Sequence, residues 1–215
     1  LTLMEQASKD RSLRRMLVDP YSLNPPGSER GPDGRDQTDA RYDAQAGTWT
    51  APFMMSLSNT RVVRRSNALL GYPYGKDFRY SEALATGRGP GGAIRATAIA
   101  AGTGALFGAA AWAPTRSLLT RMLPKPGEGP SEKAREQGEF WVRLLGLGEG
   151  FTLEARVGGK GDPGYNQTSK MLGESAICLA REVPEVKGGV HTPASCLGWK
   201  LLARLRAAGM TFEVA

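Results

Sequence analysis

An uncharged stretch of 20 residues, 96–115, constrains this chain more than any other feature of its sequence. The stretch lies between Arg95 and Arg116, and its length is the length that a helix needs to cross a bilayer. Nine of its residues are alanine and three are glycine, so it is only marginally apolar for insertion. We expect an Ala/Gly-rich apolar helix over 93–113 in one of three settings: buried in a core, inserted in a membrane or lipid surface, or packed in a larger assembly through its small residues.

Composition narrows the class of protein further. The 28 glycines and 14 prolines interrupt regular structure too often for a long coiled coil or a uniform helical bundle. Two cysteines, Cys178 and Cys196, and one histidine, His191, provide neither a disulfide framework nor an ordinary zinc site, so we expect no metal. No arrangement of serine, cysteine and histidine suggests nucleophilic catalysis, and the catalytic residues are left unknown.

The charge of the chain bears on its partners. The formal net charge of +7 comes from 28 basic and 21 acidic residues that are interleaved without a dense basic arm. We therefore expect no nucleic-acid partner, whereas attraction to anionic lipid head groups fits the same charge. We expect an intracellular protein, with association with an organellar membrane left open.

The organisation of the chain follows from its interruptions. Leu1 lies inside a helical pattern, so we expect residues 1–19 to form a helix that continues from an N-terminal domain missing here. Residues 20–49, rich in proline, glycine and aspartate, are expected to form an extended loop. Residues 50–215 are expected to form the main α+β domain, with helix 93–113 inserted. Three prolines within residues 123–130 predict a rigid linker.

The last third of the chain holds the clearest supersecondary unit. Residues 139–147 and 151–160 alternate around a Gly-Glu-Gly turn, which predicts an antiparallel hairpin. We then expect a helix over 166–181, a second helix from Thr-Pro over 192–208, and a strand over 210–214. This order predicts an α+β fold in which helices pack on an antiparallel or mixed sheet.

A basic face marks the helix that we expect over 60–70, with Ser58 or Asn59 as its cap. Three arginines share that face at i, i+3 and i+4: Arg61, Arg64 and Arg65. One interpretation is a solvated helix face, and the other is a clamp for an anion or a phosphate. The sequence leaves both open.

Aromatic side chains follow this helix. Tyr74 and Tyr80 fit core packing, and the segment 81–85 after them alternates as a strand does. Further on, Asp162 begins an Asp-Pro-Gly turn that is followed by Tyr165. Asp162 fits a helix cap, a turn former or a group that faces a cleft.

Three glycines, Gly87, Gly89 and Gly92, match a dinucleotide-binding pattern and precede a helix. The segment before them, 78–86, is charged and mixed where a nucleotide-binding strand is apolar. No acidic residue occurs between Glu82 and Glu128 to hold a ribose. We therefore expect a flexible lead into the apolar helix rather than a dinucleotide site.

Seven segments resemble one protein family in the same order along nearly the whole chain: residues 51–54, 59–71, 74–80, 123–132, 161–165, 171–175 and 192–194. The family is the saccharopine dehydrogenase-like oxidoreductases, and within it the trans-acting enoyl reductase branch. The string NTRVVRRSNALLG at 59–71 is long enough to be specific.

The resemblance implies a nicotinamide-dependent reductase with an N-terminal Rossmann domain for NAD(P) and a C-terminal α+β domain for the substrate cavity and subunit contacts. This chain looks like the C-terminal portion without the Rossmann domain. We therefore expect a substrate-binding and association domain for enoyl- or lipid-type substrates. It would be catalytically incomplete as given and would bind no cofactor by itself.

The family also implies site residues and partners. Arg61, Arg64 and Arg65 would contact cofactor phosphate or an acyl carrier, and the cleft wall would include Tyr74, Tyr80, Asp162 and Tyr165. The partner would be the missing Rossmann domain or a partner chain, in a complex or a homo-oligomer. The alternative is a non-catalytic accessory subunit of a membrane-associated complex that keeps this half of the fold, so enzyme activity of the chain alone stays open.

Overall fold

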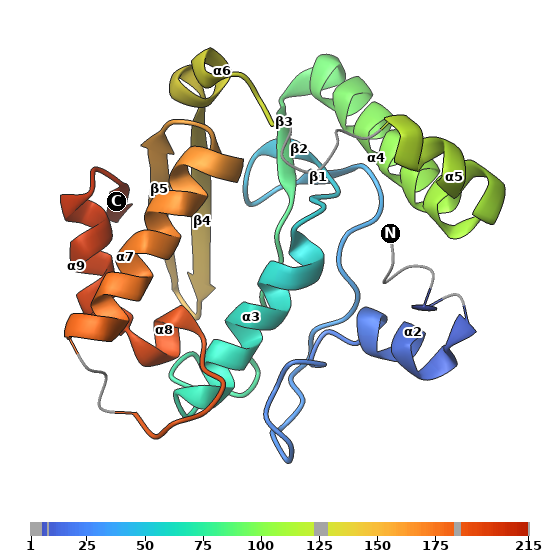
Figure 1. The fold of residues 1–215 in the computed structure, drawn as a ribbon. Helices are drawn as coiled ribbons and strands as arrows, with labels where there is room; N and C mark the ends of the chain where they lie inside the picture. The colour runs from blue at the N-terminus through green and yellow to red at the C-terminus, as the bar shows by residue number, and fades with distance from the viewer. Residues whose placement is uncertain (1–5, 8, 123–128, 183–185, 215) are drawn as a thin grey trace. The chain divides into compact units, whose positions relative to one another are not determined.

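The computed structural model describes residues 6–7, 9–122, 129–182 and 186–214 and divides the chain into two compact units. The N-terminal unit comprises residues 1–124, and the C-terminal unit comprises residues 125–215. Within the described residues, each unit combines a three-stranded antiparallel sheet with helices (Figure 1). The predicted α+β class is therefore confirmed. Most of the predicted linker lies outside the described residues.

The N-terminal unit is built around strands β1, β2 and β3, which lie side by side in that order. In chain order its described elements are α2 (Arg11–Val18), β1 (Arg41–Asp43), β2 (Thr48–Ala51), α3 (Ser56–Leu69), β3 (Leu84–Gly87), α4 (Gly89–Ala111) and α5 (Ala113–Met122). The segment predicted as an extended loop therefore ends in a hairpin. Asp43 forms its turn, because the side chain accepts hydrogen bonds from the backbone amides of Gln45 and Ala46, both at 2.9 Å.

Helix α4 begins earlier than predicted, at Gly89, because Pro90 suits the first turn of a helix. Its first turns lie against the sheet, where a Cβ atom on Gly92 would collide with the carbonyl oxygen of Gly87. Further along, most of the helix is exposed, and only 11% of its most apolar 18-residue window is buried. Within the described residues, α4 is therefore not a buried core helix. Among the described residues, α4 is the one helix long and apolar enough to cross a membrane.

Helix α3 also begins earlier than predicted, at Ser56. Neither of the two predicted caps acts as one. Asn59 donates a hydrogen bond from Nδ2 to Glu82 Oε2 at 3.0 Å, and Ser58 donates from its hydroxyl to the Met55 carbonyl at 3.2 Å. The helix ends before Gly71, whose φ of +79° is in the left-handed region that glycine favours.

The C-terminal unit follows the predicted order of strands and helices. Its described elements are α6 (Glu132–Gln137), β4 (Glu139–Gly148), β5 (Phe151–Lys160), η1 (Pro163–Gln167), α7 (Thr168–Arg181), α8 (Pro193–Cys196), α9 (Gly198–Ala207) and β6 (Thr211–Val214). The predicted hairpin is confirmed, since β4 and β5 pair antiparallel from Glu139↔Lys160 to Gly148↔Phe151. Strand β6 adds to β5 in the antiparallel direction.

The core of the C-terminal unit lies between its helices and its sheet. Buried side chains of α7 and α9, including Cys178, Leu201 and Leu205, pack with Phe140 of β4 and Phe212 of β6. The predicted single helix over 192–208 is divided into α8 and α9 at Gly198, which has a φ of +49°.

Candidate functional site

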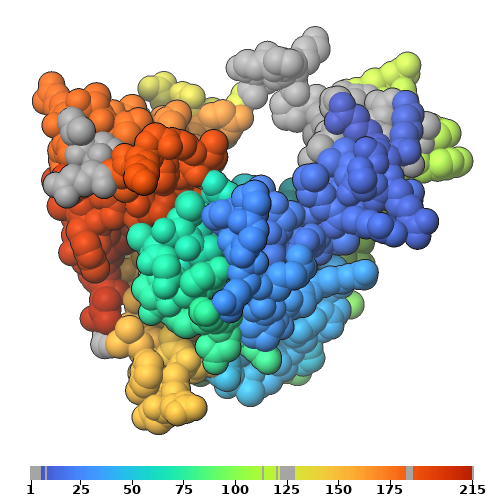
Figure 2. All heavy atoms as spheres, turned by 90° about the horizontal axis from the view of Figure 1, so that it is seen from below, coloured from blue at the N-terminus to red at the C-terminus, as the bar shows by residue number. Residues whose placement is uncertain are grey.

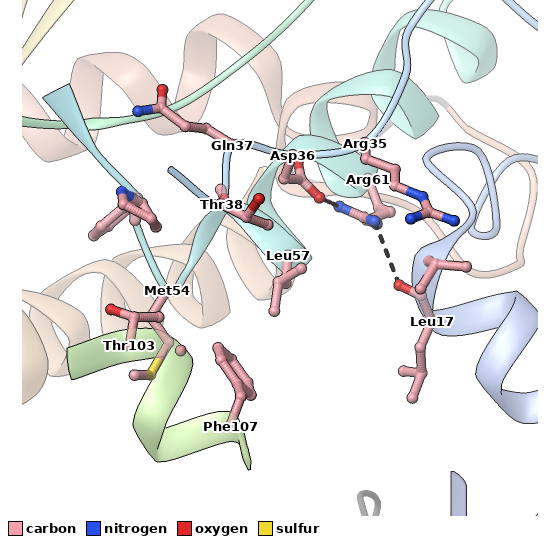
Figure 3. Close-up of a pocket in the computed structure, with 15 residues that line it drawn as sticks. Leu17, Arg35, Asp36, Gln37, Thr38, Met54, Leu57, Arg61, Thr103 and Phe107 are labelled. Atoms are coloured by element: carbon pink, nitrogen blue, oxygen red, sulfur yellow. Dashed lines mark hydrogen bonds and ion pairs between the residues drawn. The ribbon is translucent and has the colours of Figure 1, made fainter. Parts of the chain in front are cut away.

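An apolar cavity of about 360 Å³ lies in the N-terminal unit (Figure 3). This volume is within the range of small-molecule sites. Its lining is Leu17 and Val18 of α2, Arg35, Asp36, Gln37 and Thr38 of the following loop, Pro52, Phe53, Met54, Ser56, Leu57 and Arg61 at and after the end of β2, and Thr103, Gly104 and Phe107 of α4. Most of the wall is apolar, so the cavity suits a hydrocarbon group better than a polar one.

The segment between β2 and α3 carries much of the apolar wall. Pro52 has no amide hydrogen with which to continue the strand ladder, and the Ser56 amide donates to the Phe53 carbonyl at 3.0 Å. This turn directs the chain into α3 and places Phe53, Met54 and Leu57 at the cavity.

Helix α4 provides the opposite part of the lining. Thr103 and Phe107 are one helical turn apart and therefore share a face. Gly104 lies between them and has no side chain, and a Cβ atom there would meet nothing within 4 Å. The absence of a side chain at Gly104 keeps this part of the cavity open.

A buried ion pair between Asp36 and Arg61 forms the polar wall. Their side chains are 8% and 4% exposed. Thr60 donates from its hydroxyl to Asp36 Oδ1 at 3.0 Å, and Arg61 donates from Nη2 to the Leu17 carbonyl at 3.4 Å. Because a buried charge is stable only when it is paired, these bonds hold the loop and the end of α2 against α3.

Arg64 makes a second buried ion pair. It donates from Nε to Asp33 Oδ2 at 2.5 Å, from Nη1 to the Pro20 carbonyl at 3.1 Å and from Nη2 to the Tyr80 carbonyl at 2.8 Å. The loop after α2, in blue, therefore lies directly against α3, in turquoise (Figure 2).

The three predicted arginines thus share one role in this structure, since Arg65 also donates to the loop, at the Leu23 carbonyl. The interpretation as a solvated face is wrong for Arg61 and Arg64, which are buried. The helical pattern alone does not show that an aspartate-rich loop returns over this face. Their assignment to cofactor phosphate or an acyl carrier stays a prediction, and it would require the ion pairs to open.

Two of the predicted cleft residues, Tyr74 and Tyr80, are both near Phe78, with ring centroids 5.1 and 6.2 Å from that of Phe78. Tyr80 donates its hydroxyl to Glu82 Oε1 at 2.9 Å. Burial, and after it the charge of Glu82, raise the pKa of Tyr80 above its ordinary value, so the phenol stays protonated. Neither tyrosine lines the cavity, and their place in a substrate cleft stays a prediction.

The other two, Asp162 and Tyr165, belong to the C-terminal unit, so the structure places two cleft candidates in each unit. Asp162 acts as the N-cap of η1 and accepts hydrogen bonds from the amides of Asn166 at 3.0 Å and Tyr165 at 2.9 Å. The bond from Asn166 makes the largest contribution to lowering the pKa of Asp162. The Tyr165 side chain is exposed.

Replacing Asp162 with alanine should lower the melting temperature at neutral pH by about 2–4 °C, because the N-cap is lost. A carboxyl group with a lowered pKa stabilises the fold above its ordinary pKa, and this contribution disappears as the pH falls through the folded value. The difference between wild type and Asp162→Ala should therefore shrink in acid. Asp162→Asn, which keeps a capping oxygen without the charge, is the control. A gap that stays constant with pH in thermal melts would contradict the role of the ionised carboxylate.

The described residues do not fit a dinucleotide cofactor. Gly87 and Gly89 join β3 to α4, but β3 belongs to an antiparallel sheet, whereas dinucleotides bind at the carboxyl edge of a parallel one. Arg61 and Arg64 already face aspartates. Among the described residues, no group of three His, Cys, Asp or Glu side chains is suited to a metal ion. The use of NAD(P) by the complete protein stays a prediction.

Of the sequence-predicted site residues only Arg61 lines the cavity, and sequence reasoning missed the rest of the described lining. Leu17, Met54 and Phe107 come from three distant segments, and each fits an ordinary packed position in its own pattern. One sequence signal could have pointed to the cavity, the apolar run Phe53–Met54–Met55 directly after a proline. Large apolar side chains of this kind are ordinarily expected in a core. Met54 and Met55 are instead about half exposed.

Curated relatives cover almost the whole of this chain. A Mycobacterium tuberculosis protein provisionally named as a trans-acting enoyl reductase is 40% identical, over 99% of this chain and 54% of its own length. The trans-acting enoyl reductases of Mycobacterium ulcerans and Mycobacterium bovis are 36% and 37% identical, over 96% of this chain and 52% of each relative. Homologues of this chain are trans-acting enoyl reductases.

The predicted likeness to that branch is therefore confirmed. This chain spans about half the length of the curated relatives that it matches. No protein-family model matches it, and no solved structure matches it. The wider relation to saccharopine dehydrogenase-like oxidoreductases stays a prediction.

Proposed function

We propose that this chain is the acyl-binding portion of a saccharopine dehydrogenase-like, NAD(P)-dependent oxidoreductase that reduces enoyl- or lipid-type substrates. The observation that carries this proposal is the apolar cavity between α2, the start of α3 and α4. Its volume of about 360 Å³ suits an acyl chain, and the names of the homologues supply the reaction class. In this proposal residues 50–215 belong to the C-terminal domain of the complete protein.

The chemistry divides between the cofactor and the protein. Reduction of an enoyl group needs a hydride donor held against the acceptor carbon, and a nicotinamide supplies that hydride when it is bound. This chain would bind the hydrocarbon part of the substrate and exclude water from it through Phe53, Met54 and Phe107. The reduction would require the cofactor domain of the complete protein, and the chain alone would be catalytically incomplete.

A paired titration tests this division. The chain and the complete natural protein are each titrated with NADPH and with a fluorescent ten-carbon acyl probe. We expect both to bind the probe and only the complete protein to bind NADPH and reduce an enoyl thioester. Turnover by the chain alone would contradict the division, and absence of probe binding to the chain would contradict the acyl-binding role.

Helix α4 supports the second candidate, an accessory subunit of a membrane-associated complex. The helix is long, apolar and mostly exposed, with Ile94 near one end and Trp112 at the other. Indole rings favour the membrane interface, and Arg95 and Arg116, which lie on either side of the uncharged stretch, suit anionic lipid. Co-sedimentation with vesicles of phosphatidylglycerol and phosphatidylcholine tests it: retention in the supernatant with both would exclude this candidate.

A further inference from the structure

The positive and negative charges of the side chains that line the cavity are unequal in number. Among the described residues that line it, the charged ones are Arg35, Asp36 and Arg61. Asp36 and Arg61 neutralise each other in the buried ion pair. The remaining positive charge belongs to Arg35, so the part of the lining that the structure describes has a net charge of +1.

Arg35 differs from the other arginines of this region in its surroundings. Its side chain is exposed, and within the described part of the chain it forms no ion pair and no hydrogen bond. The neighbouring aspartates are already engaged, Asp33 by Arg64 and Asp36 by Arg61. Arg35 therefore has its full set of N–H donors available to a ligand.

The cavity thus combines two kinds of surface. At one side Arg35 and the Asp36–Arg61 pair are close to the end of α2, and at the other Met54 and Phe107 form an apolar wall (Figure 3). A guanidinium group binds the two oxygens of a carboxylate or a phosphate in a forked geometry. A hydrocarbon chain is favoured against Met54 and Phe107 because its burial removes apolar area from water.

We propose that the ligand of this cavity is an amphipathic molecule with an anionic head group, carboxylate or phosphate, bound at Arg35 and with its hydrocarbon chain between Met54 and Phe107. This inference rests on the proposed acyl-binding function and adds the charge and the orientation of the ligand. The head group belongs to a free acid or to a phosphate-bearing carrier, and both present the same chemistry to Arg35.

Three ten-carbon ligands separate the contribution of the head group to binding from that of the hydrocarbon chain. Decanoate, decyl phosphate and 1-decanol share the chain and differ in the head group, and each displaces a fluorescent acyl probe from the whole 215-residue chain at pH 7.5. At low salt we expect the two anions to bind roughly fivefold more tightly than the alcohol, because a partly exposed ion pair contributes at most about that factor. The preference should shrink at 1 M salt through screening. A preference for decyl phosphate over decanoate would indicate a carrier, and the reverse would indicate a free acid.

Two variants test whether the preference for anionic ligands comes from Arg35. Arg35→Gln should abolish the preference for anions and leave the affinity for 1-decanol unchanged. Arg79→Gln is the matched control, because Arg79 is also exposed, lies in the same unit and does not line the cavity. It should retain the full preference.

A failure of the head-group assignment can be told apart from a failure of the acyl-binding function. Equal affinities for decanoate and 1-decanol, or a preference that survives in Arg35→Gln, would overturn the assignment of the head group and leave acyl binding in place. If none of the three ligands binds, the acyl-binding function fails as well. Circular dichroism of Arg35→Gln, compared with that of the control, shows that a lost preference is not caused by unfolding.

Discussion

Replacing Asp36 with alanine is expected to lower the free energy of unfolding by about 3–5 kcal/mol, because it leaves the buried Arg61 guanidinium without its counter-charge. The two side chains are only 8% and 4% exposed, so water cannot replace the lost carboxylate. The substitution also removes one of the two acceptors near the Thr60 hydroxyl, since the Ser56 carbonyl at 2.7 Å remains. Urea denaturation measures the loss, and amide hydrogen exchange in α3 locates it.

The matched control is Asp39→Ala in the same loop. Asp39 also pairs with an arginine, Arg41, but these side chains are 59% and 55% exposed. Exposed pairs contribute at most about 1 kcal/mol, so this variant should be nearly neutral. The double substitution Asp36→Leu with Arg61→Met removes both charges and should recover much of the stability. Equal effects of Asp36→Ala and Asp39→Ala would contradict a structural role for the buried pair.

Filling the cavity should have the largest effect on binding. In Gly104→Leu the new side chain would occupy space that an acyl chain needs, since Gly104 lines the cavity and a Cβ atom there meets nothing within 4 Å. We expect the affinity for decanoate to fall by at least about tenfold, as burial of several methylene groups is lost. Stability should rise slightly, by about 0.5–1 kcal/mol, because glycine is unfavourable inside a helix. Competition with the acyl probe and thermal melts give the two values.

Gly102→Leu is the control for this substitution. Gly102 is on the same helix, also has open space around a Cβ atom, and does not line the cavity. It should gain the same helix stability and keep the affinity of wild type. If Gly104→Leu binds decanoate as wild type does, the cavity is not the acyl site.

The C-terminal unit could be predicted largely from its sequence, because its elements depend on residues that are close together in the chain. Strands β4 and β5 are joined by a two-residue turn with Gly150 in a left-handed conformation, so neighbouring residues carry the whole signal. The division of the last helix at Gly198 was not predictable, because glycine inside a helical pattern indicates a break only weakly.

The sequence by itself determined the α+β class, the hairpin and the apolar character of α4, because each depends on periodicity or turn chemistry within a short segment. The tertiary structure alone decided which groups surround Arg61 and Arg64. Their helical spacing is the same whether they face solvent, a phosphate or aspartates, and only the path of the loop brings Asp36 and Asp33 to them. The tertiary structure also forms the cavity, whose walls come from segments as far apart in the sequence as Leu17 and Phe107, about 90 residues. No local sequence pattern predicts that such distant segments meet.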